Sequence, residues 1–226
     1  MLLNKKQTNK KPLFIVFEGI DGAGKSTVLY AVSKRLKAKT KRKIIITREP
    51  GGENCTSAES IRSLLLENID NFAPTTCAYL YASSRNEHIQ KVLKPNLVND
   101  NVVICDRFIY SSYLYQGIAQ NVGLENVRLI NQAAVESINI DYVFYFDISY
   151  KNAMARIDRR IHTNSFDNQK KEFYFNLLKN YPKILYDPVY NHNAEIIMVN
   201  ANLDFESVVN FIVKKIAKII KQQENS

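Results

Sequence analysis

One segment near the start of the chain constrains the fold more than any other. Leu13–Glu18 is an apolar run that predicts a strand, and it leads directly into Gly19-Ile20-Asp21-Gly22-Ala23-Gly24-Lys25-Ser26-Thr27. This stretch matches the pattern G-x-x-x-x-G-K-[ST], with a strand before it and helical spacing after it, as a phosphate-binding loop requires. Its glycines let the backbone wrap an anion with the N–H groups inward, and the helix that follows adds the positive end of its dipole.

Two side chains of this loop have distinct expected roles. Lys25 can reach the β- and γ-phosphates of a nucleotide, and the Ser26 hydroxyl can coordinate Mg²⁺. The alternative is a chance glycine-rich turn, but the four matching positions and the flanking elements argue against it. The loop therefore predicts nucleoside triphosphate binding, without specifying the reaction.

The rest of the chain alternates between buried strands and helices. Four further apolar runs predict strands at Lys43–Glu49, Asn101–Asp106, Asp141–Ile148 and Glu195–Ala201. Helical spacing follows Lys25 and recurs in Thr75–Leu93, Leu124–Ile138, Lys151–Ile161 and Phe205–Ile220. This alternation predicts an α/β protein of the P-loop NTPase fold, with a five-stranded parallel sheet and helices on both faces. We expect one domain over residues 13–226, with a lid at about 151–171, after a basic tail at 1–12.

Composition excludes several classes of protein. The 226 residues are 46% hydrophobic and 23% charged, which is typical of a globular chain and not of a disordered one. No apolar run approaches the roughly 18 residues of a membrane span, and the first residues do not resemble a secretory signal. Cys55, Cys77 and Cys105 lie far apart, which favours free thiols in a reducing cytoplasm over a disulfide framework.

The basic residues are concentrated at one end of the chain. Residues 1–43 carry a formal charge of +10 and the remainder carries −1, for a total of +9. The lysines could bind nucleic acid, or they could simply form a solvated tail and helix end. Because no aromatic residues alternate with them, we favour the solvated tail and expect no nucleic-acid partner.

Polar residues follow three of the predicted strands at the points where the strands stop. These are Glu18-Gly19, Arg48-Glu49-Pro50 and Asp106-Arg107. Ligands of open parallel sheets bind beyond the carboxyl ends of the strands, so these residues should meet at one site. Asp106 ends an apolar strand beside the phosphate loop and is expected to hold Mg²⁺ together with Ser26.

The motifs that are absent narrow the reaction class. No N/T-K-x-D motif follows Tyr142–Phe146, which argues against a switch GTPase, and the LSGGQ signature of transporter ATPases is absent too. A small kinase remains. A kinase with a phosphorylated acceptor needs a second anion site, and arginine suits phosphate because its donors are bidentate. The candidates near strands 2 and 3 are Arg48, Arg62, Arg85 and Arg107.

Four segments make the resemblance to a known family specific. They are Phe17 to Thr27, Thr47-Arg48-Glu49-Pro50-Gly51-Gly52, Leu80-Tyr81-Ala82-Ser83-Ser84-Arg85, and Asp106-Arg107-Phe108 through Ser111, Ser112, Tyr115, Gln116 and Gly117. In this order the chain resembles the thymidylate kinase family over about residues 13–220. The resemblance implies transfer of the γ-phosphoryl group of ATP to dTMP, giving ADP and dTDP for dTTP synthesis.

The resemblance implies roles at the acceptor site. Arg62 and Arg107 would bind the dTMP phosphate, and Arg85 would donate to a thymine carbonyl. Tyr81 lies four residues before Arg85, so on a helix both share a face and Tyr81 could stack on the base. The alternative for Tyr81 is a core aromatic. Three more residues match nucleoside contacts: Ser112 with the base, Tyr115 crowding the sugar 2′ carbon so that ribonucleotides are excluded, and Gln116.

The donor side and the lid follow from the same resemblance. Residues 19–27 and Arg156 would bind ATP, with Lys25, Asp21 and Arg160 as the catalytic group. Asp21 matches an acid that contacts the 3′-hydroxyl or a metal-bound water, and Glu49 matches an acid near the metal and the acceptor. Arg156 and Arg160 are four residues apart, where like charges repel by roughly 0.2–0.5 kcal/mol, so a phosphate clamp is favoured over a solvated face. Ala23 in the loop matches the family subtype whose catalytic arginine comes from the lid.

The sequence departs from the family pattern at three places. Asn164-Ser165-Phe166-Asp167 replaces D-R-x-E in the lid, which removes one basic contact. Phe108 replaces the commoner tyrosine, and Asn200-Ala201-Asn202 replaces I-D-A near the adenine side.

The acceptor chemistry also predicts what is not needed. A phosphate oxygen is anionic at pH 7, so in-line transfer requires no general base, and His88, His162 and His192 are expected to be structural or on the surface. The resemblance further implies a homodimer. The alternatives are another P-loop kinase for a nucleoside or a different monophosphate, a nucleotide-binding module without transfer activity, and a nucleic-acid-binding protein.

Overall fold

A single parallel sheet organises the computed structural model, which describes residues 11–52, 54–161 and 168–224, without the side chains of 159–161 and 168–170. Its strands lie in the order β2-β3-β1-β4-β5 and all neighbours are parallel. The strands are β1 (Leu13–Glu18), β2 (Ile44–Arg48), β3 (Val102–Asp106), β4 (Tyr142–Asp147) and β5 (Glu195–Asn200). The five strands predicted from apolar runs are thus confirmed, each to within one residue at either end.

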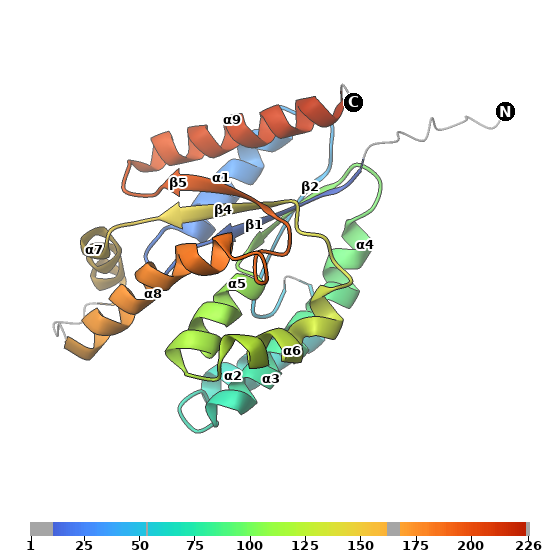
Figure 1. Cartoon of the computed structure of the whole chain (residues 1–226). Coiled ribbons are helices and arrows are strands. Elements are labelled where there is room, and N and C mark those ends of the chain that lie inside the picture. The colour runs from blue at the N-terminus through green and yellow to red at the C-terminus, as the bar shows by residue number, and fades with distance from the viewer. Residues whose placement is uncertain (1–10, 53, 162–167, 225–226) are drawn as a thin grey trace.

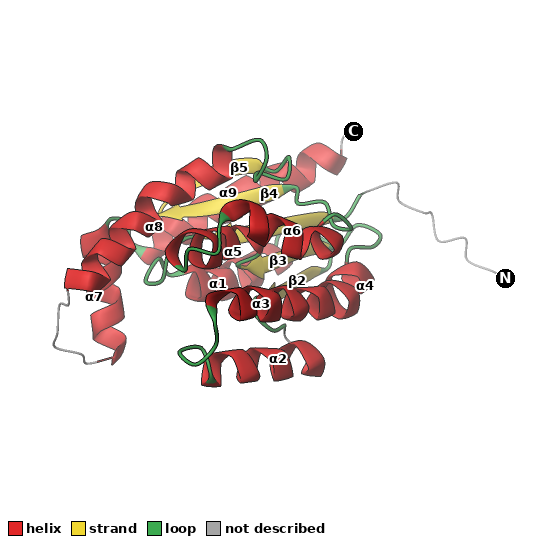
Figure 2. Cartoon of the chain, turned by 60° about the horizontal axis from the view of Figure 1, so that its bottom comes forward, coloured by secondary structure: helices red, strands yellow, loops and turns green. Residues whose placement is uncertain are grey.

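Helices cover both faces of the sheet, as predicted. Figure 1 shows α1 (Lys25–Lys37) and α9 (Phe205–Glu224) on one face, where they pack on each other. The opposite face carries α3 (Pro74–His88), α5 (Ile109–Ser112), α6 (Leu124–Val135) and α8 (Asn168–Tyr186). Between these, α7 spans Tyr150–Ile161, and α2 (Thr56–Glu67) packs outside α3, as Figure 2 shows.

Two helical segments contain wide π-type turns. Helix α3 continues through η1 (Ile89–Leu93) into the short α4 (Lys94–Asn96), so the predicted helix Thr75–Leu93 is confirmed in extent but not in regularity. Pro95 lies in α4, where it has no N–H to complete a regular helical bond. Likewise α5 continues into η2 (Tyr113–Ala119), which carries several of the expected site residues.

Two long helices were missed by the sequence analysis, each for a physical reason. Helix α2 buries only Ala58 and Leu65, so it shows no clear apolar stripe. Helix α8 contains Pro182 in its interior, which ordinarily signals the end of a helix. In both cases tertiary packing, and not local pattern, decides the helix.

The core is centred on the two strands that position the site. Every residue of β1 and β3 is buried, and β1 lies in the middle of the sheet. Phe17 packs against Phe144 and Phe146 of β4, with ring centroids 5.6 and 5.2 Å away. The edge strand β5 is only partly buried. Apolar character on both faces is what a central parallel strand requires.

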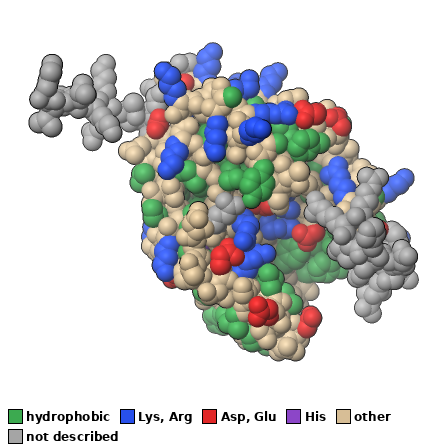
Figure 3. Space-filling model, turned by 180° about the vertical axis from the view of Figure 1, so that it is seen from behind, with side chains coloured by type: hydrophobic (Ala, Val, Ile, Leu, Met, Phe, Trp, Pro, Cys, Tyr) green, Lys and Arg blue, Asp and Glu red, His purple; other side chains and the backbone are tan. Residues whose placement is uncertain are grey.

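The surface is mixed in charge. On the face in Figure 3, basic side chains are spread among acidic and apolar ones. Within the described ranges, the helices are all too short or too polar to cross a bilayer.

Replacing Val103 tests the importance of the buried strand β3. Val103 is fully buried, so Val103→Ala should lower the free energy of unfolding by about 1.5–3 kcal/mol through lost apolar contact and a residual cavity. The matched control is Val189→Ala, since Val189 is 58% exposed, and it should cost less than about 0.5 kcal/mol. Urea unfolding measures both, and equal losses would contradict the assignment of β3 to the core.

Candidate active site

The phosphate loop joins β1 to α1 in a conformation that glycine makes possible. Gly22 and Gly24 have φ of 80° and 87°, in the left-handed region that side chains avoid. A Cβ on Gly22 would lie 2.5 Å from the Ala153 carbonyl oxygen, so this position also has no room for a side chain. The loop is therefore held close to helix α7.

Lys25 lies buried within this loop. Its Nζ donates to the carbonyl oxygens of Gly19 (2.8 Å) and Ile20 (3.0 Å). Burial, followed by repulsion from Arg107, lowers the pKa of Lys25 to about 8. The ammonium group is held where its charge is poorly solvated, so an anion bound in the loop would stabilise it.

Asp106 at the end of β3 and Ser26 at the start of α1 fit a magnesium site. The Ser26 hydroxyl donates to Oδ2 of Asp106, while Oδ1 of Asp106 is buried and has no hydrogen-bond partner among the described residues. Both groups line a small cavity of about 80 Å³ together with Asp21, Lys25 and Arg107. Hydroxyl and carboxylate oxygens are the ligands that Mg²⁺ prefers, so the expected pair is brought together in a suitable form.

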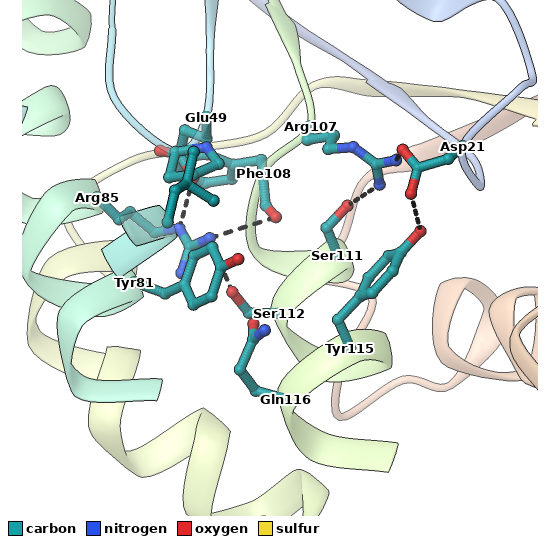
Figure 4. A pocket seen from close by; sticks show the side chains of 12 residues that line it. Asp21, Glu49, Tyr81, Arg85, Arg107, Phe108, Ser111, Ser112, Tyr115 and Gln116 are labelled. Carbon is teal, nitrogen blue, oxygen red and sulfur yellow. Dashed lines mark hydrogen bonds and ion pairs between the residues drawn. The ribbon is translucent and has the colours of Figure 1, made fainter. Parts of the chain in front are cut away.

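A larger cavity of about 260 Å³ opens beside the first. Most of the residues that sequence analysis assigned to the acceptor line it: Asp21, Glu49, Tyr81, Arg85, Arg107, Ser112, Tyr115 and Gln116 (Figure 4). Pro50, Leu66, Phe108 and Ser111 complete the wall. The strand-end prediction is confirmed in part. Glu49, Pro50, Asp106 and Arg107 line one or both cavities, whereas Arg48 lines neither and is paired with Glu59.

Arg107 lines both cavities, as does Asp21. It leaves β3 with φ of 68°, and its Nη2 lies 2.7 Å from Oδ1 of Asp21 while Nη1 donates to the Ser111 hydroxyl at 2.9 Å. Its guanidinium lies 5.3 Å from the ring centre of Tyr115, whose hydroxyl donates to the other Asp21 oxygen. Burial would raise the pKa of Asp21, but Arg107 and Lys25 lower it overall.

Arg85 is fixed at the other end of the larger cavity. It is 3% exposed, and its Nε donates to Oε2 of Glu49 at 2.8 Å. Its two terminal nitrogens donate to Asn131 (2.5 Å) and Ser112 (3.0 Å). Phe108 is fully buried, with its ring 5.4 Å from this guanidinium. A guanidinium held by three side chains can present a fixed edge to a ligand.

Glu49 and Arg62 both bond to other residues of the protein, and their expected roles stay predictions. Glu49 lines the larger cavity, and its oxygens are engaged by Arg85 and by Nδ1 of His88 at 2.9 Å. Arg62 does not line the larger cavity. Its Nη1 donates instead to the carbonyl oxygen of Pro50 at 2.9 Å, at the cavity's edge. By contrast, Tyr81 and Arg85 share a helix face as their spacing predicted.

A third cavity, of about 220 Å³, lies on the other side of the phosphate loop. Its wall is mainly apolar, with Ala23, Thr27, Val28, Leu203 and Phe205 among its residues. Arg156 also lines it, donating to the Ala201 carbonyl at 2.8 Å and lying near those of Gly22 and Ala23. Arg156 is thus bonded to backbone carbonyls beside a mainly apolar slot, and its expected contact with ATP stays a prediction.

Part of the expected lid lies outside the described residues. Arg160 falls in the last turn of α7, but its side chain is not described, nor is the segment Asn164-Ser165-Phe166-Asp167 or His162. The expected clamp by Arg160 stays a prediction.

Four buried polar residues at the site were missed or given no role by the sequence analysis. His88 connects Glu49 to the Thr47 hydroxyl, which lies 2.7 Å from its Nε2. Asn131 holds Arg85, and Tyr181 approaches from α8 to contact Glu18. A buried acid directly before the phosphate loop could have singled out Glu18, whereas nothing in the local sequence marks Asn131 or Tyr181.

Comparisons of sequence and of structure with known proteins point to the same family. The family model for thymidylate kinase matches residues 17–212. A thymidylate kinase of Ureaplasma parvum serovar 3 is 48% identical over 230 residues, covering 99% of both chains. One from Mycoplasma mobile is 36% identical over 93% of this chain and 100% of its own. The crystal structure of thymidylate kinase from Ehrlichia chaffeensis superimposes with a TM-score of 0.67 and 26% identity, covering 91% of this chain and 98% of that one.

The lowered pKa of Lys25 predicts proton uptake when a triphosphate binds. The bound anion should raise the pKa of Lys25 above its free value of about 8, so affinity is full below that pH and falls as the pH rises through the bound pKa. Calorimetry in two buffers of different ionisation enthalpy should show that Lys25 takes up most of one proton on binding at about pH 9 and little at about pH 7. Lys25→Met should abolish the uptake, and a wild-type signal without uptake at the higher pH would contradict the assignment.

Proposed function

The chain belongs to the thymidylate kinase family, and we propose that its larger cavity binds dTMP while the phosphate loop beside it binds ATP with Mg²⁺. Its activity is transfer of the γ-phosphoryl group of ATP to dTMP, giving ADP and dTDP. One observation supports the arrangement most strongly. Arg107 lines both cavities, so it can bind the acceptor phosphate at the side that faces the phosphate loop.

The larger cavity suits a thymine nucleotide at both ends. Arg107 supplies paired donors for the acceptor phosphate, once an anion competes with Asp21 for them. At the far end Arg85 can donate to a thymine carbonyl, and Tyr81 can lie against the base. Ser112 at the end of α5 and Gln116 in η2 add polar contacts, and Tyr115 occupies the wall near the expected sugar.

The donor would lie across the phosphate loop. The backbone amides of residues 19–27 and the Lys25 ammonium would bind its phosphates. Arg156 and the apolar slot around Leu203 would hold the adenine ring. Ser26 and Asp106 would hold Mg²⁺, which when bound neutralises charge on the phosphates.

Catalysis would consist of positioning and charge neutralisation. The attacking oxygen of the dTMP phosphate is already anionic, so no residue is needed to remove a proton. Arg107 would orient that oxygen, Lys25 would meet the charge on the transferring group, and Arg160 would add a second cation from α7. His88 fits this scheme as a buried partner of Glu49 with no contact to the reacting atoms.

We also propose a homodimer formed through the surface of α2, α3 and α6. A wide groove of about 750 Å³ runs between these helices and is lined by Ile61, Tyr79, Ala82 and Ala133 among others. Tyr79 is 57% exposed and Leu129 on α6 is 53% exposed, so a second copy could bury both. A monomeric mass in light scattering would contradict this proposal.

We also propose that the protein is cytoplasmic and has no nucleic-acid partner. Cys55, Cys77 and Cys105 are all free and buried, which supports a reducing cytoplasm. Basic side chains spread among acidic ones support the absence of a nucleic-acid partner (Figure 3). Removing residues 1–11 should then leave kinase activity intact.

An acceptor panel tests the assignment of the larger cavity. Thymidine, dTMP, dUMP, dGMP and AMP are offered separately with ATP and Mg²⁺, and nucleotide products are separated. The proposal expects dTMP to give the highest kcat/KM. A better acceptor among the others would favour a different P-loop kinase, and ATP binding without any transfer would favour a binding module.

Arg107→Ala should remove the paired phosphate contact at the acceptor. We expect kcat/KM for dTMP to fall by about 10²-fold or more, on the order of 2–4 kcal/mol, with little change in ATP binding. The control is Arg35→Ala, which removes an exposed arginine paired with Glu206 on the opposite face. Near-normal dTMP kinetics in the Arg107 variant would reject the acceptor site.

Tyr115→Ala should relax the choice of sugar. Without the ring, the ratio of kcat/KM for the ribonucleotide analogue to that for dTMP should rise, since the space near the 2′ carbon opens. Tyr115→Phe keeps the ring and loses only the hydroxyl contact to Asp21, so its ratio should stay near the wild-type value. A ratio unchanged by the alanine substitution would exclude the steric explanation.

A further inference from the structure

The carboxylate of Glu18 lies between the two anion sites without lining either cavity. It is fully buried, and its oxygens are the acceptors in every hydrogen bond described for it. Its Oε1 accepts the backbone N–H groups of Phe108 (2.8 Å) and Ser111 (3.3 Å), and its Oε2 accepts the hydroxyls of Ser111 (2.7 Å) and Tyr181 (2.5 Å). Burial raises the pKa of Glu18, and Arg107 together with these donors opposes that rise. Four donors on two oxygens match an ionised carboxylate.

The two hydroxyls lie 3.2 Å from each other, and each also contacts a different neighbour. The Ser111 hydroxyl accepts from Nη1 of Arg107 at 2.9 Å. The Tyr181 hydroxyl accepts from the backbone N–H of Gly19, the first residue of the phosphate loop, at 3.2 Å. An uninterrupted hydrogen-bonded path therefore joins the guanidinium of Arg107 to the phosphate loop, and at each step the donors point toward Glu18.

The path also holds strained and distant parts of the chain. Arg107 has φ of 68°, a left-handed conformation that is unfavourable for a residue other than glycine. The next backbone N–H, that of Phe108, donates to Glu18. Tyr181 belongs to α8, on the far side of the α7–α8 connection, and its ring packs on Tyr145 with centroids 5.1 Å apart. The Tyr181 hydroxyl thus connects α8 to the phosphate loop and, through Glu18, to the residues that follow β3.

We propose that Glu18 is a positioning residue for phosphoryl transfer, and that the Tyr181 hydroxyl is its link to the phosphate loop. Together they set the distance and direction between the guanidinium that binds the acceptor phosphate and the loop that binds the donor. This inference rests on the proposed function, since it needs Arg107 at the acceptor. A purely structural carboxylate would support the fold without affecting the alignment of the two phosphates.

Tyr181→Phe removes the link while keeping the ring in place. The ligands of each phosphate remain, so KM for ATP and for dTMP should stay within about threefold. Alignment is lost, so the single-turnover rate of phosphoryl transfer should fall by about tenfold or more. The matched control is Tyr110→Phe, because Tyr110 is also fully buried and its hydroxyl donates to the Asn191 carbonyl at 2.7 Å, outside both cavities. The control should lose similar thermal stability and keep its rate within about twofold.

A double-mutant cycle tests whether the arms to Arg107 and to the phosphate loop are coupled, through Glu18 or through the direct contact between the Ser111 and Tyr181 hydroxyls. Ser111→Ala cuts the arm to Arg107, and its combination with Tyr181→Phe should be little slower than the slower single variant. If the fold losses in rate of the two single variants multiply in the double variant, the two arms act independently and the shared path is overturned. A transfer rate for Tyr181→Phe equal to that of the control would overturn the inference while leaving the proposed function in place. Absence of dTDP formation by the wild-type chain would overturn both.

Discussion

The parallel pairing of β1 with β3 is the constraint on which the rest of the structure depends. Their register sets Phe17 beside Asp106, so the phosphate loop that follows β1 begins next to the residues that follow β3. Ser26 then meets Asp106, and Arg107 reaches Asp21 across the gap. A shift of one residue in this register would turn the strand ends to opposite faces and separate the two anion sites.

The buried cations of the site favour the binding of anionic ligands. Lys25 and Arg107 are both largely buried. Among the described contacts, Lys25 donates to the neutral carbonyls of Gly19 and Ile20, whereas Arg107 is paired with Asp21 and lies over the Tyr115 ring. Burying a cation without an opposite charge in contact is unfavourable, so a phosphate bound in the loop beside Lys25 would relieve that cost.

The polar network around the larger cavity serves rigidity more than charge. Glu49 is held by Arg85 and His88, and Arg85 is held in turn by Asn131 and Ser112. Each of these side chains is hydrogen-bonded to at least one other, which favours one conformation over several. Glu18 does the same between the cavities. Rigid support of this kind holds the Arg85 guanidinium in one position at the wall of the larger cavity.

The sequence by itself determined the five strands and the phosphate loop, because each depends on local pattern. Its resemblance to a known family pointed to most of the residues that line the larger cavity. It could not show that α2 and α8 are helices, since α2 buries little and α8 contains Pro182. Only the tertiary structure decided that Arg62 bonds to Pro50, that Arg156 lies beside an apolar slot, and that Asn131 and Tyr181 belong to the site. These contacts join residues distant along the chain, and their partners are set by how helices pack on the sheet, which no local spacing records.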